Sequence, residues 1–143
     1  MSTFAVAHLH EVKMGAQIVE YLQRIDATLA PFGGHFVLHG GRYERLEGDW
    51  RGDLIAIEFP NRDLARAWYR SDAYQAILPL RMDNSVGDVI LIDAVPASHV
   101  ATDVLCERTS TRREREACRA HARGTASAES IIALSCRNTR CNS

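Results

Sequence analysis

The first 95 residues show two alternating hydrophobic periods. In four short runs, apolar side chains recur at every second position, which is the period of a half-buried β-strand. Between these runs they recur at every third or fourth position, as on one face of a helix. The pattern predicts strands over 3–10, 35–39, 53–59 and 88–95, with helices after the first and third strands. The predicted element order is therefore βαββαβ.

Glycine and proline mark the boundaries in the first half of this pattern. The helix predicted over 14–30 ends at Gly33-Gly34, since glycine tolerates the left-handed conformation that follows many helices. Gly40-Gly41 predicts a bulge in the second strand, which 42–46 would then prolong to a turn at 47–49. The apolar stripe of the helix consists of Ile18, Leu22, Ile25 and Leu29.

Capping residues mark the helices of the second half. Asn61 is a suitable N-cap for a helix that contains Trp68. Asp72, with Gln75 three residues later, has the capping-box spacing and predicts a short further helix that ends near Pro79.

The order βαββαβ is typical of the ferredoxin-like α+β fold, an antiparallel four-stranded sheet with helices on one face. Right-handed crossovers place the strands in the spatial order 4-1-3-2. The helices are expected to cover the more uniformly apolar set of strand side chains: Ala5, Ala7, Leu9, Phe36, Leu38, Ile55, Ile57, Phe59, Ile90 and Ile92.

The other face of the predicted sheet mixes apolar and ionisable side chains. Its apolar members are too many to leave in water, and its charged members need partners if they are buried. A second copy of the chain, packed sheet against sheet around a partly polar cavity, satisfies both conditions and predicts a homodimer. The expected members of this face are Phe4, Val6, Val37, Leu54, Ala56, Val89 and Leu91, with His8, His10, His35, His39, Glu58 and Asp93.

Composition divides the chain near residue 97. All 10 aromatic residues lie in the first 74 positions, and all 4 cysteines lie after position 105. We therefore expect a ferredoxin-like domain over 1–97 and a C-terminal extension over 98–143 that is disordered or partly helical. Another interpretation is that the extension is translated in a shifted reading frame. The cysteine spacing matches no paired zinc motif, and reduced thiols agree with a cytoplasmic protein. A net charge of −1 and the lack of a long apolar run predict neither nucleic acid nor membrane as a partner.

Several short motifs at fixed offsets resemble the uncharacterised family called domain of unknown function 1330, of the dimeric α+β barrel superfamily. The resemblance runs from Tyr21 to Val95 and implies the same fold and dimer, with no established activity. Many relatives have arginine where this chain has His35, and acidic residues where it has His8 and His10. The matching motifs are 27–34 (ATLAPFGG), Gly40-Gly41, 46–50 (LEGDW), 58–60 (EFP), 65–69 (ARAWY) and 71–75 (SDAYQ).

The polar face supplies the candidate chemistry. A histidine paired with a carboxylate in an apolar cavity can act as a general base near neutral pH. The candidates for catalysis are Glu58, His8 and His39, and either His35 or His39 opposes Glu58, depending on the strand register. The same side chains could instead only form hydrogen bonds with one another across the dimer, without a role in catalysis. The candidates for ligand binding are His10, His35, Asp93, Trp68 and Tyr69.

No motif for a metal or a bound cofactor stands out, and none is predicted. Trp68, Tyr69 and Tyr74 have helical spacing that favours a core position over a ligand pocket. Arg81 could meet an anionic ligand, although a solvated charge is the simpler expectation. The sequence thus predicts a cofactor-independent enzyme for a small organic molecule, or alternatively a noncatalytic ligand-binding or structural dimer.

Overall fold

The computed structural model describes residues 1–107 and 112. The chain forms two compact units, residues 1–95 and 96–143. Among the described residues, no helix is long and apolar enough to cross a membrane. The cytoplasmic location stays a prediction.

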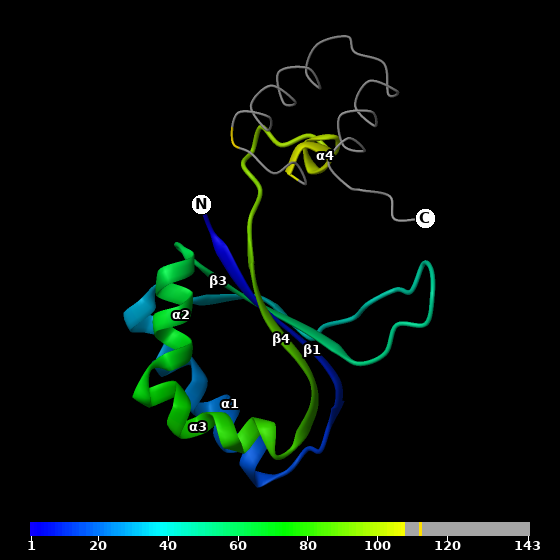
Figure 1. Ribbon diagram of the computed structural model, residues 1–143. Helices are drawn as coiled ribbons and strands as arrows, with labels where there is room; N and C mark the ends of the chain where they lie inside the picture. Colours follow the sequence, from blue (N-terminus) through cyan, green and yellow to red (C-terminus); the bar gives the residue numbers. More distant parts are fainter. Residues whose placement is uncertain (108–111, 113–143) are drawn as a thin grey trace, which may run out of the picture. The chain divides into compact units, whose positions relative to one another are not determined.

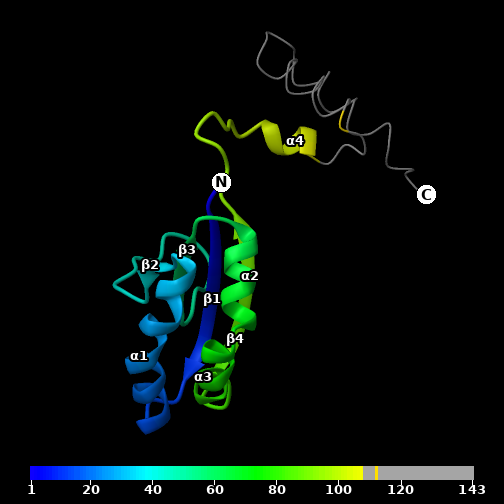
Figure 2. The same cartoon turned by 90° about the vertical axis from the view of Figure 1, so that its left-hand side faces the viewer.

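The first unit has the predicted order of elements (Figure 1). Its four strands form one antiparallel sheet in the order β2-β3-β1-β4, which confirms the predicted arrangement. The helices form a layer on one face of this sheet, seen from the helix side in Figure 2. The elements are β1 (Thr3–Val12), α1 (Ala16–Leu29), the 3-10 turn η1 (Ala30–Phe32), β2 (His35–His39), β3 (Asp53–Phe59), α2 (Arg62–Arg70), α3 (Asp72–Met82) and β4 (Ser85–Asp93).

The helix ends follow from local chemistry. Gly33 closes η1 with a φ of 67°, in the left-handed region that favours glycine. The Asn61 side chain accepts a hydrogen bond from the Leu64 N–H and caps α2 as predicted. The cap of α3 is Ser71, not Asp72, and the helix continues through Pro79 to Met82. The early end predicted for this helix is wrong, because side chains on both sides of Pro79 are buried and hold its last turn.

The bulge of β2 lies at Val37. Its neighbours Phe36 and Leu38 pair with Ile57 and Ala56, which are consecutive in β3. The bulge predicted at Gly40-Gly41 is therefore wrong, and residues 42–46 form no strand. One extra residue in a strand reverses the face of every later side chain. His39 consequently points to the same side as Phe36, and the two rings stack with centroids 4.4 Å apart.

The register of β4 inverts the faces predicted for that strand. Ala5 of β1 lies opposite Leu91, so Leu91 and its alternate neighbour Val89 belong to the helix-covered face. Ile90 and Ile92 point to the open face and are 54% and 50% exposed. Both alternating sets of β4 are apolar, so alternation alone could not tell which set lies inside. Leu38 of β2 was also predicted under the helices and lies instead on the open face, because the Val37 bulge reverses its direction.

The register of β4 also moves Asp93. It lies opposite Thr3, on the helix side of the sheet, and not among the open-face histidines as predicted. The Thr3 hydroxyl donates a hydrogen bond to Asp93 at 2.6 Å, and the Arg62 guanidinium donates to it from α2 at 3.0 Å. Asp93 thus connects the end of β4 to the first turn of α2, which gives it a structural role in this unit.

A buried hydrogen bond connects α1 and α2 inside the core. The Trp68 indole N–H donates to the Thr28 hydroxyl at 3.0 Å, and that hydroxyl donates to the Ile25 carbonyl within α1. Both side chains are buried. The core around them consists of Ala5, Tyr21, Ile25, Leu29, Ile57, Phe59, Ala65, Trp68, Tyr74, Ile77 and Leu78.

The described part of the second unit contains α4 (Asp103–Glu107). Asp103 accepts a hydrogen bond from the Val100 N–H and lies 3.6 Å from His99. The rest of the extension predicted over 98–143, with three of its four cysteines, lies outside the described residues.

The Trp68–Thr28 bond predicts a measurable coupling. Thr28→Val keeps the side-chain shape but leaves the buried indole N–H without a partner, which is expected to lower the free energy of unfolding by about 1–3 kcal/mol. Urea denaturation of Thr28→Val, Trp68→Phe and the double variant measures the coupling. Additive effects of the two substitutions would contradict this role of the bond.

The contacts of Asp93 predict a dependence of stability on acid. The hydrogen bonds from Arg62, and then from Thr3, hold the pKa of Asp93 below its usual value. A lowered folded-state pKa stabilises the fold above the unfolded-state pKa of about 3.9, and this stabilisation disappears as the pH falls through the folded-state value. Asp93→Asn is therefore expected to be less stable than wild type at neutral pH, with the difference shrinking as the pH falls below about 4.

Denaturation midpoints across this pH range test the expectation. Asp26→Asn is the matched control, because Asp26 is exposed and has no side-chain ion pair or hydrogen bond within the described part of the chain. A difference between wild type and Asp93→Asn that stays constant with pH would overturn it.

Candidate functional site

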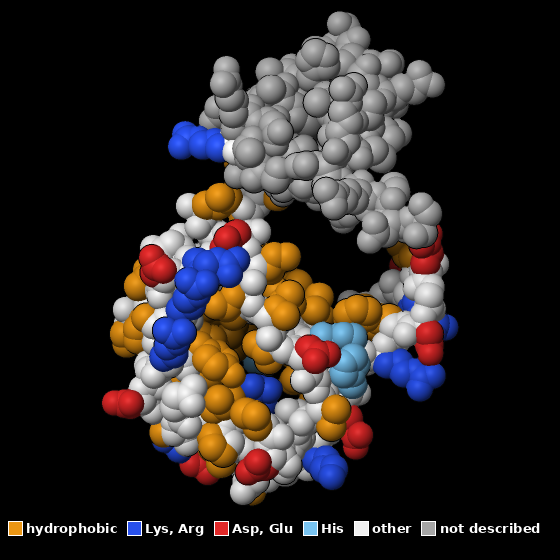
Figure 3. Space-filling view, viewed as in Figure 1, with side chains coloured by type: hydrophobic (Ala, Val, Ile, Leu, Met, Phe, Trp, Pro, Cys, Tyr) orange, Lys and Arg blue, Asp and Glu red, His pale blue; other side chains and the backbone are white. Residues whose placement is uncertain are grey.

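A cavity of about 400 Å³ lies between the helices and the sheet. Figure 3 shows it as a hollow that hydrophobic side chains surround, with a positively charged group inside. The sheet contributes its helix-facing side chains, and α1, α2 and α3 form the opposite wall. The apolar part of the lining consists of Ala5, Ala7, Leu9, Val12, Met14, Ile18, Leu22, Ile25, Phe36, Ile55, Ile57 and Val89, and the rest of Tyr21, His39, Gly40, Asp53, Trp68, Tyr74, Arg81 and Ser85.

Three polar side chains meet in the wall formed by α1 and α3. The Tyr21 hydroxyl interacts with the Tyr74 hydroxyl and with the Arg81 guanidinium. All three residues are buried, with exposed fractions of 8% for Tyr21, 2% for Tyr74 and 9% for Arg81. Burial, and then the neighbouring Tyr74, raise the pKa of Tyr21 well above its usual value, and Arg81 lowers it only in part. Tyr21 therefore keeps its proton and can donate a hydrogen bond into the cavity.

Helical spacing produces this cluster. Tyr21 lies three residues after Ile18 and four before Ile25, on the stripe of α1 that packs against the core. Arg81 lies seven residues after Tyr74 and four after Ile77, on the buried stripe of α3. From the sequence, Tyr74 and Arg81 were candidates but Tyr21 was not, and the simpler expectation for Arg81 was a charge exposed to water. An arginine in register with buried apolar residues is the signal that could have identified the site.

His39 and Asp53 form a second polar part of the cavity wall. His39 ends β2 and Asp53 begins β3, and both belong to the helix-facing side of their strands. Both residues are exposed to water. Of the three predicted catalytic residues, only His39 lines this cavity.

Glu58 and His35 lie together on the open face. They are opposite each other in the β2–β3 pairing, and their side chains approach to 3.4 Å. The register therefore selects His35, and not His39, as the partner of Glu58. The Val37 bulge is the reason, because it turns His39 to the opposite face of the sheet.

The other two open-face histidines lie at the far end of β1. The His8 and His10 rings are 4.2 Å apart, and His10 lies 3.5 Å from Asp88 of β4. The Trp50 ring stacks on His8 at 4.1 Å with an angle of 11° between the planes. His8 also forms a hydrogen bond with the Arg51 carbonyl at 2.7 Å. These contacts attach the loop between β2 and β3 to β1.

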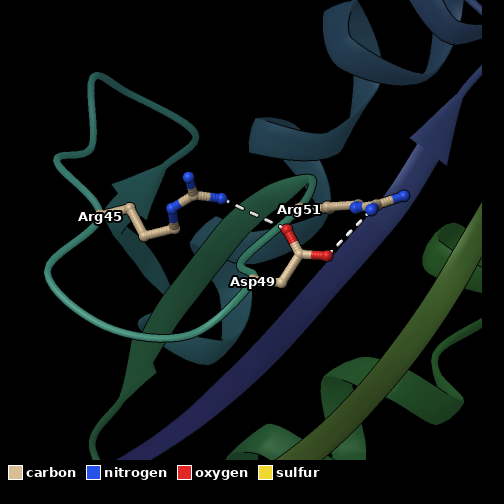
Figure 4. A network of polar contacts seen from close by, with 3 residues as sticks. All are labelled: Arg45, Asp49 and Arg51. Atoms are coloured by element: carbon tan, nitrogen blue, oxygen red, sulfur yellow. Dashed lines mark hydrogen bonds and ion pairs between the residues drawn. The ribbon is translucent and has the colours of Figure 1, made fainter.

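An ion-pair network shapes this loop (Figure 4). Asp49 accepts hydrogen bonds from Arg45 at 3.3 Å and from Arg51 at 2.9 Å. The network folds the loop back on itself next to Trp50 and so helps to present the indole ring to His8.

The remaining predicted ligand-binding residues are distributed over different places. Trp68 is buried in the core and lines the cavity, whereas Tyr69 lies with Arg66 and Arg70 at a second hollow against β4. Asp93 forms the structural contacts described above and lines neither hollow. Within residues 1–107 and 112, no three His, Cys, Asp or Glu side chains are arranged to hold a metal ion.

The single chain also offers a second place where a ligand could bind. The sequence reasoning expected a cavity between the sheets of two protomers, lined by the open-face histidines and carboxylates. The cavity in the structure lies on the other face of the sheet, within one chain, and the cavity between two sheets stays a prediction. Sequence alternation identifies two faces but not the volume left between a sheet and its helices, because that volume depends on side-chain packing.

The fold is shared with proteins of known structure. A dimeric ferredoxin-like protein of unknown function from Jannaschia sp. CCS1 has a TM-score of 0.54 at 13% identity, covering 66% of this chain and 100% of that one. A protein of unknown function from Rhodopseudomonas palustris has a TM-score of 0.52 at 14% identity, covering 66% and 83%. SnoaB, a cofactor-independent oxygenase from Streptomyces nogalater, has a TM-score of 0.43 at 14% identity, covering 69% and 96%.

Sequence comparison gives a family and no curated relative. None of the curated proteins matches this sequence. The family model "Domain of unknown function (DUF1330)" matches residues 2–95, which are almost the whole of the first unit. The resemblance noted from the motifs is thereby confirmed, and the chain belongs to the DUF1330 family.

Proposed function

We propose that this chain binds a small organic molecule in the cavity between the helices and the sheet of each protomer. The observation that carries the proposal is the cavity itself, a hollow lined mostly by apolar side chains and partly open to water. Its volume of about 400 Å³ lies within the range of about 300–1,000 Å³ typical of small-molecule sites.

The composition of the wall supports the same proposal. Ligand sites are mostly apolar, with a few polar groups that orient the bound molecule. Here the strands and α1 supply the apolar surface, and Tyr21, Tyr74 and Arg81 supply a compact polar group on one side. The bound molecule would therefore have an apolar body and at least one polar end.

Catalysis on the bound molecule is a second candidate function, and the same three residues favour it. A cation and hydroxyl donors stabilise negative charge that develops on a carbonyl oxygen when a neighbouring carbon loses a proton. Of the predicted catalytic residues, His39 is the one that can contact a molecule in the cavity, whereas Glu58 and His8 lie on the opposite face of the sheet. The reaction would use side chains of the chain itself, in keeping with the cofactor-independent enzyme predicted from the sequence.

A homodimer formed through the open sheet face belongs to the proposal. Ile90, Ile92 and Leu38 expose about half of their surface on this face, and large exposed apolar surfaces mark interfaces. The structural neighbour from Jannaschia is described as dimeric. Two sheets that pack face to face would bury these side chains, and His35 and His10 would lie beside the carboxylates of Glu58 and Asp88.

Filling the cavity tests the binding proposal. Ala7 lines the cavity from β1, and Ala7→Phe places a ring in the space that a ligand would occupy. We expect wild type to bind 2-phenylethanol in an NMR titration, and the variant to bind it at least about tenfold more weakly. Met82→Phe is the control, because Met82 is 58% exposed and lies outside the lining. Equal affinity of wild type and Ala7→Phe would contradict the proposed site.

A charge on the open face tests the dimer. Ile92→Glu places a carboxylate in the proposed apolar interface, opposite Phe4 on β1. We expect wild type to sediment as a dimer at micromolar concentration and the dissociation constant of the variant to rise by about 100-fold or more. Val19→Glu is the matched control, since Val19 is an exposed apolar residue of α1, on the helix layer. A monomeric wild type, or an Ile92→Glu variant that stays dimeric, would contradict this assembly.

A further inference from the structure

Arg81 is a buried cation without a buried anion. Its exposed fraction is 9%, and within residues 1–107 and 112 no carboxylate forms an ion pair with it. Arginine keeps its positive charge in proteins, and a buried charge is costly unless a group of opposite charge compensates it. The residues that do interact with Arg81 through their side chains include Tyr21, whose hydroxyl is neutral.

The position of Arg81 makes the cavity the place where a compensating anion can enter. Its side chain belongs to the lining, together with the two tyrosines of the cluster. Both tyrosine hydroxyls can donate a hydrogen bond to an anion. Tyr21 in particular stays protonated, because burial raises its pKa and favours the neutral hydroxyl.

We propose that the cavity binds a small carboxylic acid as its anion, with the carboxylate beside Arg81 and the apolar body along the helix-facing side of the sheet. This inference rests on the proposed function and names the chemical class of its ligand. Guanidinium and carboxylate groups match each other in shape and form two parallel hydrogen bonds.

The charges in the wall favour a single negative charge on the ligand. Arg81 is the one Lys or Arg among the residues that line the cavity in the described part of the chain. A phosphate with two negative charges would carry one charge without a partner into an apolar space, which is unfavourable. A carboxylate matches the one guanidinium.

Asp53 and His39 set the direction of the ligand. Asp53 begins β3 on one side of β1, whereas the turn after Arg81 leads into β4 on the other side. The Asp53 carboxylate repels a second anion, so the carboxylate of the ligand is expected at the Arg81 end and its uncharged part toward Asp53 and His39.

A pair of compounds with the same carbon skeleton tests this inference. Phenylacetate carries a carboxylate where 2-phenylethanol carries a hydroxymethyl group, and both are titrated into the full chain at neutral pH with NMR detection. We expect wild type to bind phenylacetate at least about tenfold more tightly than the alcohol. Arg81→Met is expected to remove this preference by weakening the binding of the acid much more than that of the alcohol, while Arg81→Lys keeps part of the preference.

Two further variants keep the test decisive if Arg81→Met does not fold. Tyr21→Phe removes one hydroxyl from the cluster and is expected to weaken the binding of phenylacetate by about threefold to tenfold, and the binding of the alcohol by less. Arg24→Met removes the same charge from the exposed face of α1, where Arg24 pairs with Glu20, and is expected to leave both affinities unchanged.

The outcomes separate the two proposals. If wild type binds neither compound, both the cavity function and the ligand class are wrong. Equal binding of the acid and the alcohol would overturn only the ligand class. Equal losses of both affinities in folded Arg81→Met or Tyr21→Phe would assign these residues to the packing of the wall and would also overturn the ligand class.

Discussion

The pairing of β1 with β3 on one side and β4 on the other decides which side chains of this protein can meet. Side chains alternate between the two faces of a sheet, so each register assigns every strand residue either to the helices or to the open face. Thr3 opposite Asp93 gives the helices Val89 and Leu91 and gives the open face Ile90 and Ile92. The cavity, the contact of Asp93 with Arg62 of α2 and the proposed dimer surface all depend on this assignment.

Bulges modify that assignment at two functionally important points. The Val37 bulge brings His39 into the cavity wall and leaves His35 beside Glu58. The irregularity between Leu9 and Glu11 of β1 shifts the pairing with β4 just before Val12, which lines the cavity. The extra residue at Val37 therefore separates His35 and His39, which a regular alternation would place on the same face.

The two faces of the sheet have different physical tasks. The helix-covered side leaves a mostly apolar volume, partly open to water, with a buried arginine in its wall. The open side carries exposed aliphatic side chains next to paired histidines and carboxylates. Ligand binding and self-association would therefore use opposite faces of one sheet. A substitution on one face would then test one of these functions and leave the other intact.

The sequence by itself determined the fold class, the order of the strands and the family, because periodicity, capping residues and turn glycines are local signals. It also indicated an open face too apolar to remain in water. Only the tertiary structure decided the inward face of β4, the partner of Glu58 and the burial of Arg81. These features depend on strand register and on packing between distant elements, and both sets of β4 side chains are apolar enough to lie inside. The cavity was also decided by the tertiary structure, since its volume is the space that the packed side chains of the helices and the sheet leave unfilled.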